Sequence, residues 1–371
     1  MKIGSLFSGV AGLDMAVEQF FDADVAWFVE HDAAPSKVLT HHYPGVPNYG
    51  DVTTVDWASV EPVDILTGGF PCQDVSLAGA RRGLKDGTRS GLWSECAKAI
   101  DILRPSLVVI ENVRGLLSAE AVGVMESDAW NLGDRSSRPT LRALGAVLGN
   151  LAELGYDTEW CGVRAADAGA PHNRFRVFIL AYPASVGHER AGRARGWWPG
   201  PADSGGVAAD ASSGGWGRRA QDTQRDQIRR NAPPRRSADV TADAGSDGFR
   251  RDTELYCQQI KPALKTLRGE HAGRHSRTEW GQYAPAIERW GRVLGRPAPS
   301  PVRYDGRNGA PRLNPELTEW MMGWPAGWVT DPAIGLTRNE QLKACGNGVV
   351  TQQALLALAL LWQRILELAP A

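Results

Sequence analysis

The sequence predicts an α/β fold, a doubly wound sheet with helices on both faces followed by a smaller and partly irregular region. Short, mostly apolar runs rich in β-branched residues alternate with stretches of helical periodicity over residues 1–182. This alternation is typical of strands joined by crossover helices. Polar residues directly follow several of the apolar runs, at the ends of strands where open α/β sheets bind ligands. We therefore expect a ligand-binding sheet in this half of the chain.

The predicted strands are apolar without alternation, as expected for strands that are buried on both faces. They are Lys2–Phe7, Ala26–Glu30, Asp64–Gly68, Ser106–Glu111 and Arg176–Tyr182. A further strand is expected to end at Asp51. The helical stretches between the strands include Ala11–Phe20, Ser90–Leu103 and Thr140–Leu154.

The composition changes at about Pro183 and divides the chain into three predicted parts. Residues 183–311 contain 20 Arg and 2 Lys against 14 Asp and Glu, a surplus of +8, so the net charge of −1 leaves −9 for the remainder. Such a positive lobe suits a nucleic-acid partner, although a solvated Arg-rich linker has the same composition. Gly- and Arg-rich phrases with little apolar content predict loop or disorder over much of 184–255. A helix at Trp280–Leu294 and an apolar helix at Gln352–Leu368 predict order before and within the C-terminal part, residues 312–371.

Other features of the sequence limit where the protein works. The N-terminus lacks the basic segment and unbroken apolar core of a signal peptide, and no apolar stretch is long enough to predict a membrane span. The five scattered cysteines show no zinc-ligand spacing. We expect a cytoplasmic protein with free thiols and no metal.

Three strand ends carry residues that fit a nucleotide-like ligand. Gly9 and Gly12 allow a sharp turn and a close backbone approach to a ligand, although an ordinary strand-to-helix turn explains them as well. Glu30 is placed to accept hydrogen bonds from ribose hydroxyls, or is a surface carboxylate. Asp51 accepts from an exocyclic amine or caps a turn.

Cys72 and Glu111 are the two candidates for chemistry at the other strand ends. Cys72 follows Pro71 on an exposed loop, where nearby Arg174 and Arg176 would favour the thiolate. Glu111 ends an apolar run, and partial burial would raise its pKa and suit it to proton donation; a capping role is the alternative. The sequence therefore predicts a nucleophile and an acid beside one crevice.

Several short stretches of this sequence, which include the candidate residues, resemble the motifs of the cytosine-5 DNA methyltransferase family. The matching stretches, in family order, are Phe7-Ser8-Gly9-Val10-Ala11-Gly12, Gly69-Phe70-Pro71-Cys72-Gln73, Glu111-Asn112-Val113, Arg174-Phe175-Arg176, Leu313-Asn314-Pro315-Glu316 with Met322-Gly323-Trp324-Pro325, and Gly346-Asn347-Gly348-Val349-Val350. The resemblance implies a Rossmann-like, S-adenosylmethionine-dependent methyltransferase sheet over residues 1–182. It also implies a target recognition domain at 183–311 and a C-terminal segment that returns to the sheet.

The resemblance assigns a role to each candidate residue. A flipped cytosine is attacked at C6 by Cys72, while Glu111 acts at N3 and Arg176 with Arg174 contacts O2 and the loop carrying Cys72. The residues implied for S-adenosylmethionine are Phe7, Gly9, Gly12, Leu13, Glu30, Asp51, Val52, Pro71 and Asn347. The residues implied for DNA are Gln73, Ser76 and Gly79.

The implied partner is double-stranded DNA bound by a monomer, with a cognate restriction endonuclease as a candidate partner. Three positions depart from the usual family pattern: His172 stands where Gln is common, Cys345 where Leu is usual, and Thr351 where Pro is usual. None of them removes a candidate catalytic side chain.

Several alternatives remain open at the level of sequence. An RNA cytosine-5 methyltransferase shares this motif set, and a DNA-binding regulator could keep the fold without turnover. A dehydrogenase-like sheet would fit the glycines but leaves Cys72 and Glu111 unexplained. A hydrolase pair of Cys72 with His172 lacks a third orienting residue.

Overall fold

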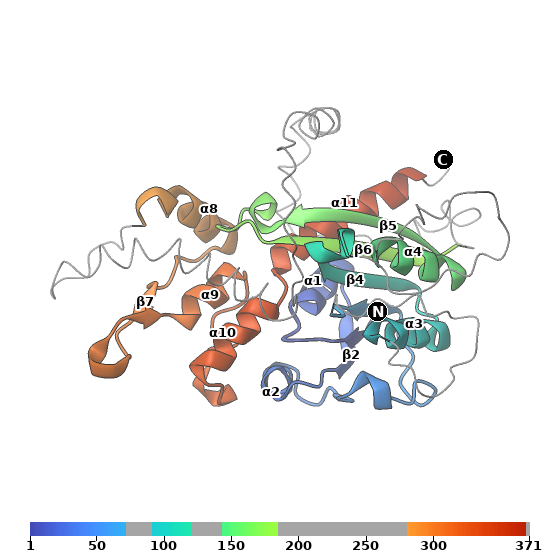
Figure 1. The fold of residues 1–371 in the computed structure, drawn as a ribbon, viewed down its shortest axis with the longest axis horizontal. Helices are drawn as coiled ribbons and strands as arrows, with labels where there is room; N and C mark the ends of the chain where they lie inside the picture. Colours follow the sequence, from blue (N-terminus) through green and yellow to red (C-terminus); the bar gives the residue numbers. More distant parts are fainter. Residues whose placement is uncertain (72–90, 120–142, 185–279, 369–371) are drawn as a thin grey trace, which may run out of the picture.

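A mixed sheet of six strands forms the centre of the protein (Figure 1). The computed structural model describes residues 1–71, 91–119, 143–184 and 280–368. The strand order is β2-β1-β3-β4-β6-β5. The strands are β1 (Lys2–Leu6), β2 (Asp24–Val29), β3 (Ile65–Gly68), β4 (Leu107–Val113), β5 (Tyr156–Arg164) and β6 (Phe175–Pro183).

The first four strands are parallel, so their carboxyl ends lie at one edge of the sheet. β1 pairs with β2 and β3, and β3 pairs with β4. In register, Leu6 is opposite Gly68, and Gly68 is opposite Ile110. This arrangement confirms the expectation that the polar residues after these strands share one edge.

Helices cover both faces of the sheet, which confirms the doubly wound α/β prediction. Ile65, Val109 and Leu180 pack on one face against α1 (Gly12–Phe21) and α11 (Thr351–Leu368). The alternate residues of the same strands pack on the other face, against α3 (Leu92–Leu103) and α4 (Ala143–Glu153). Most of these strand residues are under 5% exposed, and their burial on both faces explains why the strands read as continuous apolar runs.

A smaller group of elements gathers at one end of the sheet, on the left of Figure 1. It is built around Trp290, Trp320 and Trp324, which are fully buried in one cluster. The elements are α2 (Ala33–His42), α8 (Ala284–Leu294), the hairpin of β7 (Val302–Arg303) and β8 (Arg312–Leu313), α9 (Pro315–Met321) and α10 (Arg338–Asn347). Short 3₁₀ helices span Val52–Thr54, Arg114–Leu117, Ala165–Ala168, Gly281–Tyr283, Arg307–Gly309 and Pro332–Ile334. The helix predicted at Trp280–Leu294 is present as α8, and its core contacts with α9 cross the predicted boundary at residue 311.

The structure corrects one of the strand predictions and adds a strand that was not predicted. The strand expected to end at Asp51 is absent: Asn48 makes one isolated bridge to Phe28, and Asp51 caps the 3₁₀ helix that follows. β5 was not predicted, because charged residues such as Asp157, Glu159 and Arg164 interrupt its apolar positions. In addition, β6 runs antiparallel to β4 and β5, so the far side of the sheet departs from a fully parallel arrangement.

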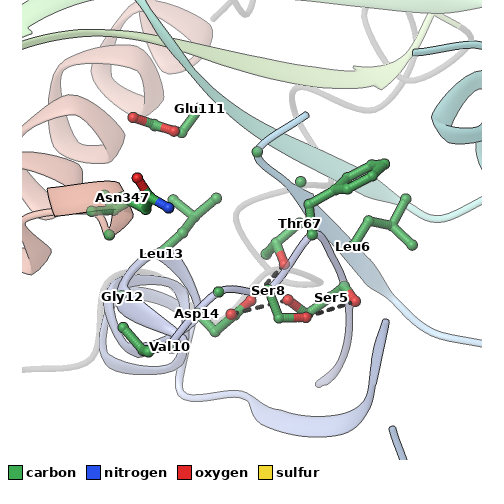
Figure 2. Close-up of a pocket in the computed structure, with 16 residues that line it drawn as sticks. Ser5, Leu6, Ser8, Val10, Gly12, Leu13, Asp14, Thr67, Glu111 and Asn347 are labelled. Carbon is green, nitrogen blue, oxygen red and sulfur yellow. Dashed lines mark hydrogen bonds between the residues drawn. The ribbon is translucent and has the colours of Figure 1, made fainter. Parts of the chain in front are cut away.

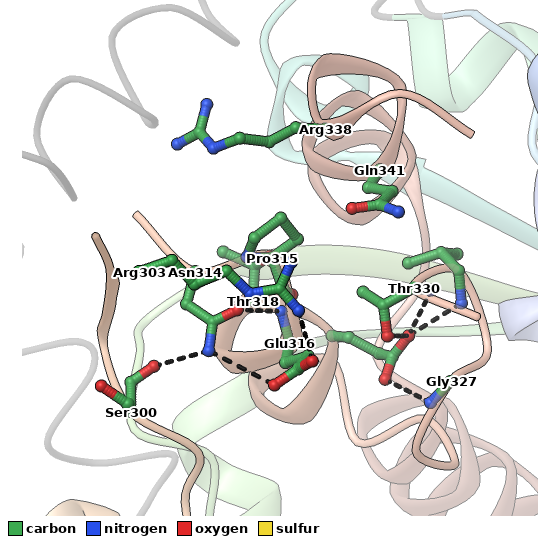
Figure 3. Close-up of polar contacts among 12 residues, drawn as sticks. Ser300, Arg303, Asn314, Pro315, Glu316, Thr318, Gly327, Thr330, Arg338 and Gln341 are labelled. Carbon is green, nitrogen blue, oxygen red and sulfur yellow. Dashed lines mark hydrogen bonds and ion pairs between the residues drawn. The ribbon is translucent and has the colours of Figure 1, made fainter. Parts of the chain in front are cut away.

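Glu319, at 1% exposure, connects this smaller group to the first loop of the sheet. Its two carboxylate oxygens accept hydrogen bonds from the backbone N–H groups of Gly327, Val329 and Thr330 at 2.8, 2.8 and 3.0 Å. Dashed lines in Figure 3 mark the contacts at the labelled residues Gly327 and Thr330. The loop held in this way carries Trp328, whose Nε1 donates to the carbonyl of Val10 at 2.8 Å. The buried carboxylate thus fixes a contact beside the strand-end edge.

The C-terminal helices α10 and α11 include a long apolar stretch. Arg338–Leu366 is long and apolar enough to cross a membrane by length and composition, contrary to the expectation from sequence that no stretch would be. However, 56% of its apolar window is buried inside the protein, and α11 packs against α1 and β5. The buried apolar side chains of α11 therefore form part of the core.

Candidate functional site

A cavity opens at the carboxyl ends of β1, β3 and β4, where the polar clusters were predicted to meet (Figure 2). It encloses about 400 Å³ of empty space, part of which is open to solvent. Its walls are the stretch 5–10, the start of α1 (12–14), Thr67–Gly69, Glu111 and the segment 347–349. Residues that are more than 300 positions apart in sequence thus form one site.

The loop after β1 has an unusual backbone that shapes one wall of this cavity. Phe7, Gly9 and Ala11 have positive φ angles of 52°, 55° and 63°. Gly adopts such angles readily, whereas Phe and Ala do so at a steric cost. Strained residues of this kind cluster at functional sites.

Gly12 allows a close contact between α1 and Val349 that the sequence did not suggest. A Cβ at this position would lie 2.5 Å from the carbonyl oxygen of Val349. The side-chain hydroxyl of Thr351 donates to the Gly12 carbonyl at 3.3 Å, and Trp324 Nε1 donates to Val349 O at 3.0 Å. Gly12 therefore lets α1 approach the C-terminal segment closely, and this contact closes the cavity on that side.

Glu30 adjoins the cavity through the first loop. One of its carboxylate oxygens accepts from Gly9 N at 2.8 Å, and the other accepts from Asp32 N at 2.7 Å. Burial raises the pKa of this carboxyl, although the two amides and His31 oppose the shift. Each oxygen keeps a further lone pair, so Glu30 could still accept from a ligand hydroxyl.

The remaining predicted cofactor residues divide into two groups. Phe7, Gly9, Gly12, Leu13 and Asn347 line the cavity. Glu30, Asp51, Val52 and Pro71 are outside its lining. The Asp51 carboxylate accepts from Thr53 N and Oγ1 at 2.9 and 2.8 Å, and these contacts lower its pKa.

Glu111 and Arg176 form a buried ion pair at the edge of the cavity. Glu111 Oε1 lies 2.7 Å from Arg176 Nε, and the two residues are 8% and 9% exposed. They come from β4 and β6, where Glu111 is opposite Phe178 and Arg176 is opposite Val113. Burial raises the pKa of Glu111, and the charges of Arg176 and Arg174 oppose the rise. A carboxylate has further lone pairs beyond the one that faces Arg176, so Glu111 retains hydrogen-bonding capacity in a desolvated place.

Asn112 joins this pair to the segment that leads to Cys72. Its side-chain amide donates to the carbonyl of Phe70 at 2.9 Å, and Phe70 is packed against Trp93 in the core. A Cβ on Gly69 would lie 3.5 Å from Glu111 Oε2. The stretch before Pro71 is therefore held against Glu111. Cys72, Gln73, Ser76 and Gly79 lie outside the described residues.

Arg174 has partners that differ from those expected. Its two terminal nitrogens donate to the carbonyls of Gly346 and Gly348 at 2.7 and 2.6 Å. The guanidinium therefore clamps the backbone on both sides of Asn347, which lines the cavity. Arg174 and Arg176 thus serve different walls of the site.

His172 anchors the same stretch of chain to α9. Its Nε2 lies 3.1 Å from the carbonyl oxygen of Met321, so this nitrogen carries the proton and donates. Burial lowers the pKa of His172 to about 4, with Arg174 and Arg176 adding to the effect. The imidazole is therefore neutral near pH 7 and serves as a hydrogen-bond donor.

Sequence reasoning missed several side chains that build the site. Asp14, Ser5 and Thr67 line the floor of the cavity, while Trp324 and Trp328 fix its closing segments. Asp14 carried a signal, because it is a charged residue on the otherwise apolar inward face of α1. Trp324 belongs to one of the quoted motifs, but no sequence feature identified its contact with Val349 or the contact of Trp328 with Val10.

Comparison with known proteins identifies sequences and structures that are similar to this chain. A sequence model of the family described as C-5 cytosine-specific DNA methylase matches residues 1–356. Type II methyltransferase M.NgoBV of Neisseria gonorrhoeae is 31% identical over 184 residues, 48% of this chain and 40% of that protein. The DNA N-6-adenine-methyltransferase of Escherichia phage P1 is 40% identical over 128 residues, 31% of this chain and 17% of that protein.

The matches to individual proteins are partial in extent or distant in sequence. The aligned part of this chain spans less than half of the length of both curated relatives. The crystal structure of the S. pombe Dnmt2 methyltransferase covers 98% of this chain and 99% of its own, at 13% identity and a TM-score of 0.49. The family match, in contrast, extends over nearly the whole sequence, and this chain belongs to the family of C-5 cytosine-specific DNA methylases.

Proposed function

We propose that this protein is a DNA (cytosine-5)-methyltransferase that uses S-adenosylmethionine as its methyl donor and Cys72 as its nucleophile. The observation that carries the proposal is the buried Glu111–Arg176 pair at the edge of a cavity formed by the strand ends. The segment held against Glu111 leads directly to Pro71 and Cys72. With Glu111 as an acid at the cavity edge, Cys72 as the nucleophile would suit attack on a planar base.

The cavity fits an adenosine-containing donor on chemical grounds. The positive-φ loop at 7–11 leaves backbone space, and Glu30 beside it keeps acceptor lone pairs for hydroxyl groups. Phe7, Gly9, Gly12, Leu13 and Asn347 would hold the donor, with Glu30, Asp51, Val52 and Pro71 at its margins. When bound, S-adenosylmethionine supplies an electrophilic methyl group.

The other steps of the proposed reaction depend on Cys72, Glu111 and Arg176. The Cys72 thiolate forms a bond to C6 of a cytosine that has been flipped out of the duplex, and this addition makes C5 nucleophilic. Glu111 holds a proton at N3 and thereby accommodates the charge pushed into the ring, while Arg176 keeps Glu111 oriented. After C5 is methylated and loses its proton to a base, the bond to C6 breaks and Cys72 is released.

We further propose that residues 183–311 recognise the DNA target, with residues 312–371 returning to the sheet. The surplus of +8 in this region supports contacts with phosphates, which contribute affinity without sequence information. Gln73, Ser76 and Gly79 would close over the DNA. We also propose that the protein acts in the cytoplasm as a monomer, together with a cognate restriction endonuclease.

Covalent trapping tests the proposal without knowledge of the recognition sequence. Duplex DNA is synthesised with 5-fluorocytosine at every cytosine, so that C5 cannot lose a proton after methyl transfer. With S-adenosylmethionine, the wild-type protein should form an adduct that survives denaturing electrophoresis, and Cys72→Ser should form none while still binding the donor. An adduct in Cys72→Ser, or none in the wild type, would overturn the mechanism.

The identity of the product separates this function from its alternatives. Mass spectrometry of nucleosides from treated duplex DNA and treated tRNA should show 5-methylcytosine in the DNA alone. N6-methyladenine would match the name of the phage P1 relative instead, and methylated tRNA would support the RNA reading. Bisulfite sequencing of DNA from expressing cells would then give the recognition site.

A further inference from the structure

The hairpin of β7 and β8 extends from the smaller group of elements, on the left of Figure 1. Its tip, residues 304–311, is mostly exposed, and Tyr304 at 65% has the highest exposure among the large hydrophobic side chains described as exposed. Within the described part of the chain, the side chains of Arg307, Asn308 and Arg312 form no hydrogen bond or ion pair. The steps proposed above give these side chains no role.

The base of the hairpin, in contrast, is firmly held. Asn314 is 2% exposed, its backbone N–H donates to Pro301 O at 3.0 Å, and its side-chain amide donates to Ser300 O at 2.8 Å. Arg303 of β7 pairs with Glu316 of α9, and Figure 3 shows this pair beside the contact of Asn314 with Ser300. The hairpin therefore leaves the protein in a fixed direction.

The tip is a single defined turn. The N–H of Gly306 donates to Ala310 O at 3.0 Å, and the N–H of Gly309 donates back to Gly306 O at 2.9 Å. A Cβ at Gly306 would lie 2.5 Å from Ala310 O, so the turn requires glycine there. Asn308 has φ 59°, a left-handed conformation that Asn adopts more readily than most residues. The exposed side chains are thus carried on a preorganised backbone, which lowers the entropic cost of binding.

The shape and chemistry of the hairpin suit duplex DNA. The major groove admits a two-stranded β-ribbon, and Arg and Asn are the side chains that bind guanine and adenine edges there with two hydrogen bonds. Residues 280–313 contain six Arg and no Lys against Glu288 and Asp305, a surplus of +4 that complements phosphates. A Cβ at Gly306 would lie 3.1 Å from Arg312 Cδ, so the stem of Arg312 runs along the turn below the tip.

Helix α10 connects the hairpin to the cavity. Arg338, at its first residue, donates from Nε and a terminal nitrogen to Leu313 O at 3.2 and 2.9 Å. Asn347, at its last residue, lines the cavity. A helix of ten residues is about 15 Å long, roughly the length of four base pairs. The hairpin base thus lies within a short recognition site's length of the proposed methyl-transfer site.

We propose that the β7–β8 hairpin enters the major groove beside the target cytosine, where Arg307 and Asn308 contact base edges and Arg312 contacts a phosphate. This inference rests on the proposed function and adds specificity-determining residues to it. It assigns sequence readout to the tip of the hairpin and affinity without sequence information to its flank.

Methylation of a duplex library with randomised bases around one cytosine tests the base contacts. Bisulfite sequencing then gives the relative rate for each sequence. In Arg307→Ala and in Asn308→Gly, the preference at one base pair each should fall about 5- to 150-fold, the discrimination typical of a bidentate contact. Glycine retains the backbone angle of Asn308, so this variant removes the amide without straining the turn.

The salt dependence of DNA binding tests the phosphate contact. Arg312→Ala should weaken binding to all sequences alike, and the slope of log affinity against log salt should lose about 0.9. Its sequence preference should stay that of the wild type. Arg364→Ala is the matched control, because it removes an exposed arginine of α11, whose described contacts are with Glu159 and Trp160 O at the β5 edge, and it should change neither quantity.

The outcomes separate this inference from the function on which it rests. Unchanged sequence preference in both Arg307→Ala and Asn308→Gly would overturn the inference and leave the methyltransferase proposal standing. A uniform loss of rate on every sequence in these two variants would do the same, since it would show a structural role for the tip. If the wild-type protein methylated no cytosine in the library, the proposed function itself would fail.

Discussion

The ion pair between Glu111 and Arg176 is the residue-scale feature on which the proposed chemistry depends. An exposed carboxylate would be ionised and strongly hydrated, whereas burial at 8% exposure raises the pKa of Glu111. Arg176 limits that rise and holds the carboxyl in one orientation. The pair can therefore carry a proton to a base while remaining fixed in place.

Replacing Glu111 by Gln should affect rate far more than binding. The amide keeps the size and one acceptor of the carboxyl but cannot donate and recover a proton. We expect kcat to fall about 10²- to 10⁴-fold, with affinity for duplex DNA changed less than about threefold. Single-turnover methylation and fluorescence anisotropy measure the two quantities, and comparable losses in both would point to a structural role for Glu111.

At the scale of elements, the segment 346–349 is held by three other parts of the chain. Arg174, just before β6, clamps it, Trp324 donates to the carbonyl of Val349, and Gly12 at the start of α1 packs against it. Asn347 lies between the two carbonyls that Arg174 binds. This element therefore connects the wall that would hold the methyl donor to the strand that carries Arg176.

Arg174→Lys should weaken donor binding because one ammonium cannot reproduce two diverging hydrogen bonds. The loss of one charged hydrogen bond predicts a rise of about tenfold or more in the Kd for S-adenosylmethionine. DNA affinity should be unchanged. Arg104→Lys is the matched control, since Arg104 also binds two backbone carbonyls, those of Asp101 and Leu154, away from the cavity. If both variants bind the donor equally well, Arg174 does not position Asn347.

Gly12→Ala should destabilise the contact between α1 and the C-terminal segment. The added methyl would lie 2.5 Å from Val349 O, so we expect a loss of about 1–3 kcal/mol in the free energy of unfolding and a weaker Kd for the donor. Gly149→Ala in α4 meets nothing within 4 Å and should gain about 0.5–1 kcal/mol. Urea denaturation of both variants checks the opposite signs, and a neutral Gly12→Ala would mean that the segment yields easily.

The sequence predicted elements well where a single physical pattern dominated. The central strands were found because burial on both faces makes them continuously apolar. β5 was missed because it is an edge strand in which charged residues such as Asp157, Glu159 and Arg164 interrupt the apolar positions. The strand expected at Asp51 was wrong, since a Gly-Asp turn signal also fits the start of a 3₁₀ helix.

At the scale of the whole molecule, strand-end residues could be predicted to converge, but their partners could not. Parallel strands fix which ends share an edge, so Glu111 and the first loop were correctly placed together. The partners of Arg174 are 172 and 174 positions away in the sequence, and the contact of Trp328 with Val10 spans 318 positions. Such pairings depend on how the C-terminal segment returns to the sheet, which no local pattern encodes.

Buried ionisable groups give the whole molecule two opposing responses to pH. His172 has a folded-state pKa of about 4 against an ordinary 6.5, so the unfolded chain gains a proton first as the pH falls. This favours unfolding by up to about 3 kcal/mol between pH 6.5 and 4. Asp14 has a folded-state pKa of about 6 against 3.8, so its folded form holds a proton that the unfolded chain has lost. This favours unfolding by about 3 kcal/mol as the pH rises from 3.8 to 6.

The two responses should become visible when either group is replaced. His172→Gln keeps a donor for Met321 O but cannot be protonated, so its stability relative to wild type should increase as the pH falls from 7 to 4. Asp14→Asn cannot ionise, so its relative stability should increase as the pH rises over the same range. Urea denaturation at pH 4, 5, 6 and 7 measures both differences. Parallel, pH-independent offsets would show that neither group has a shifted pKa in the folded state.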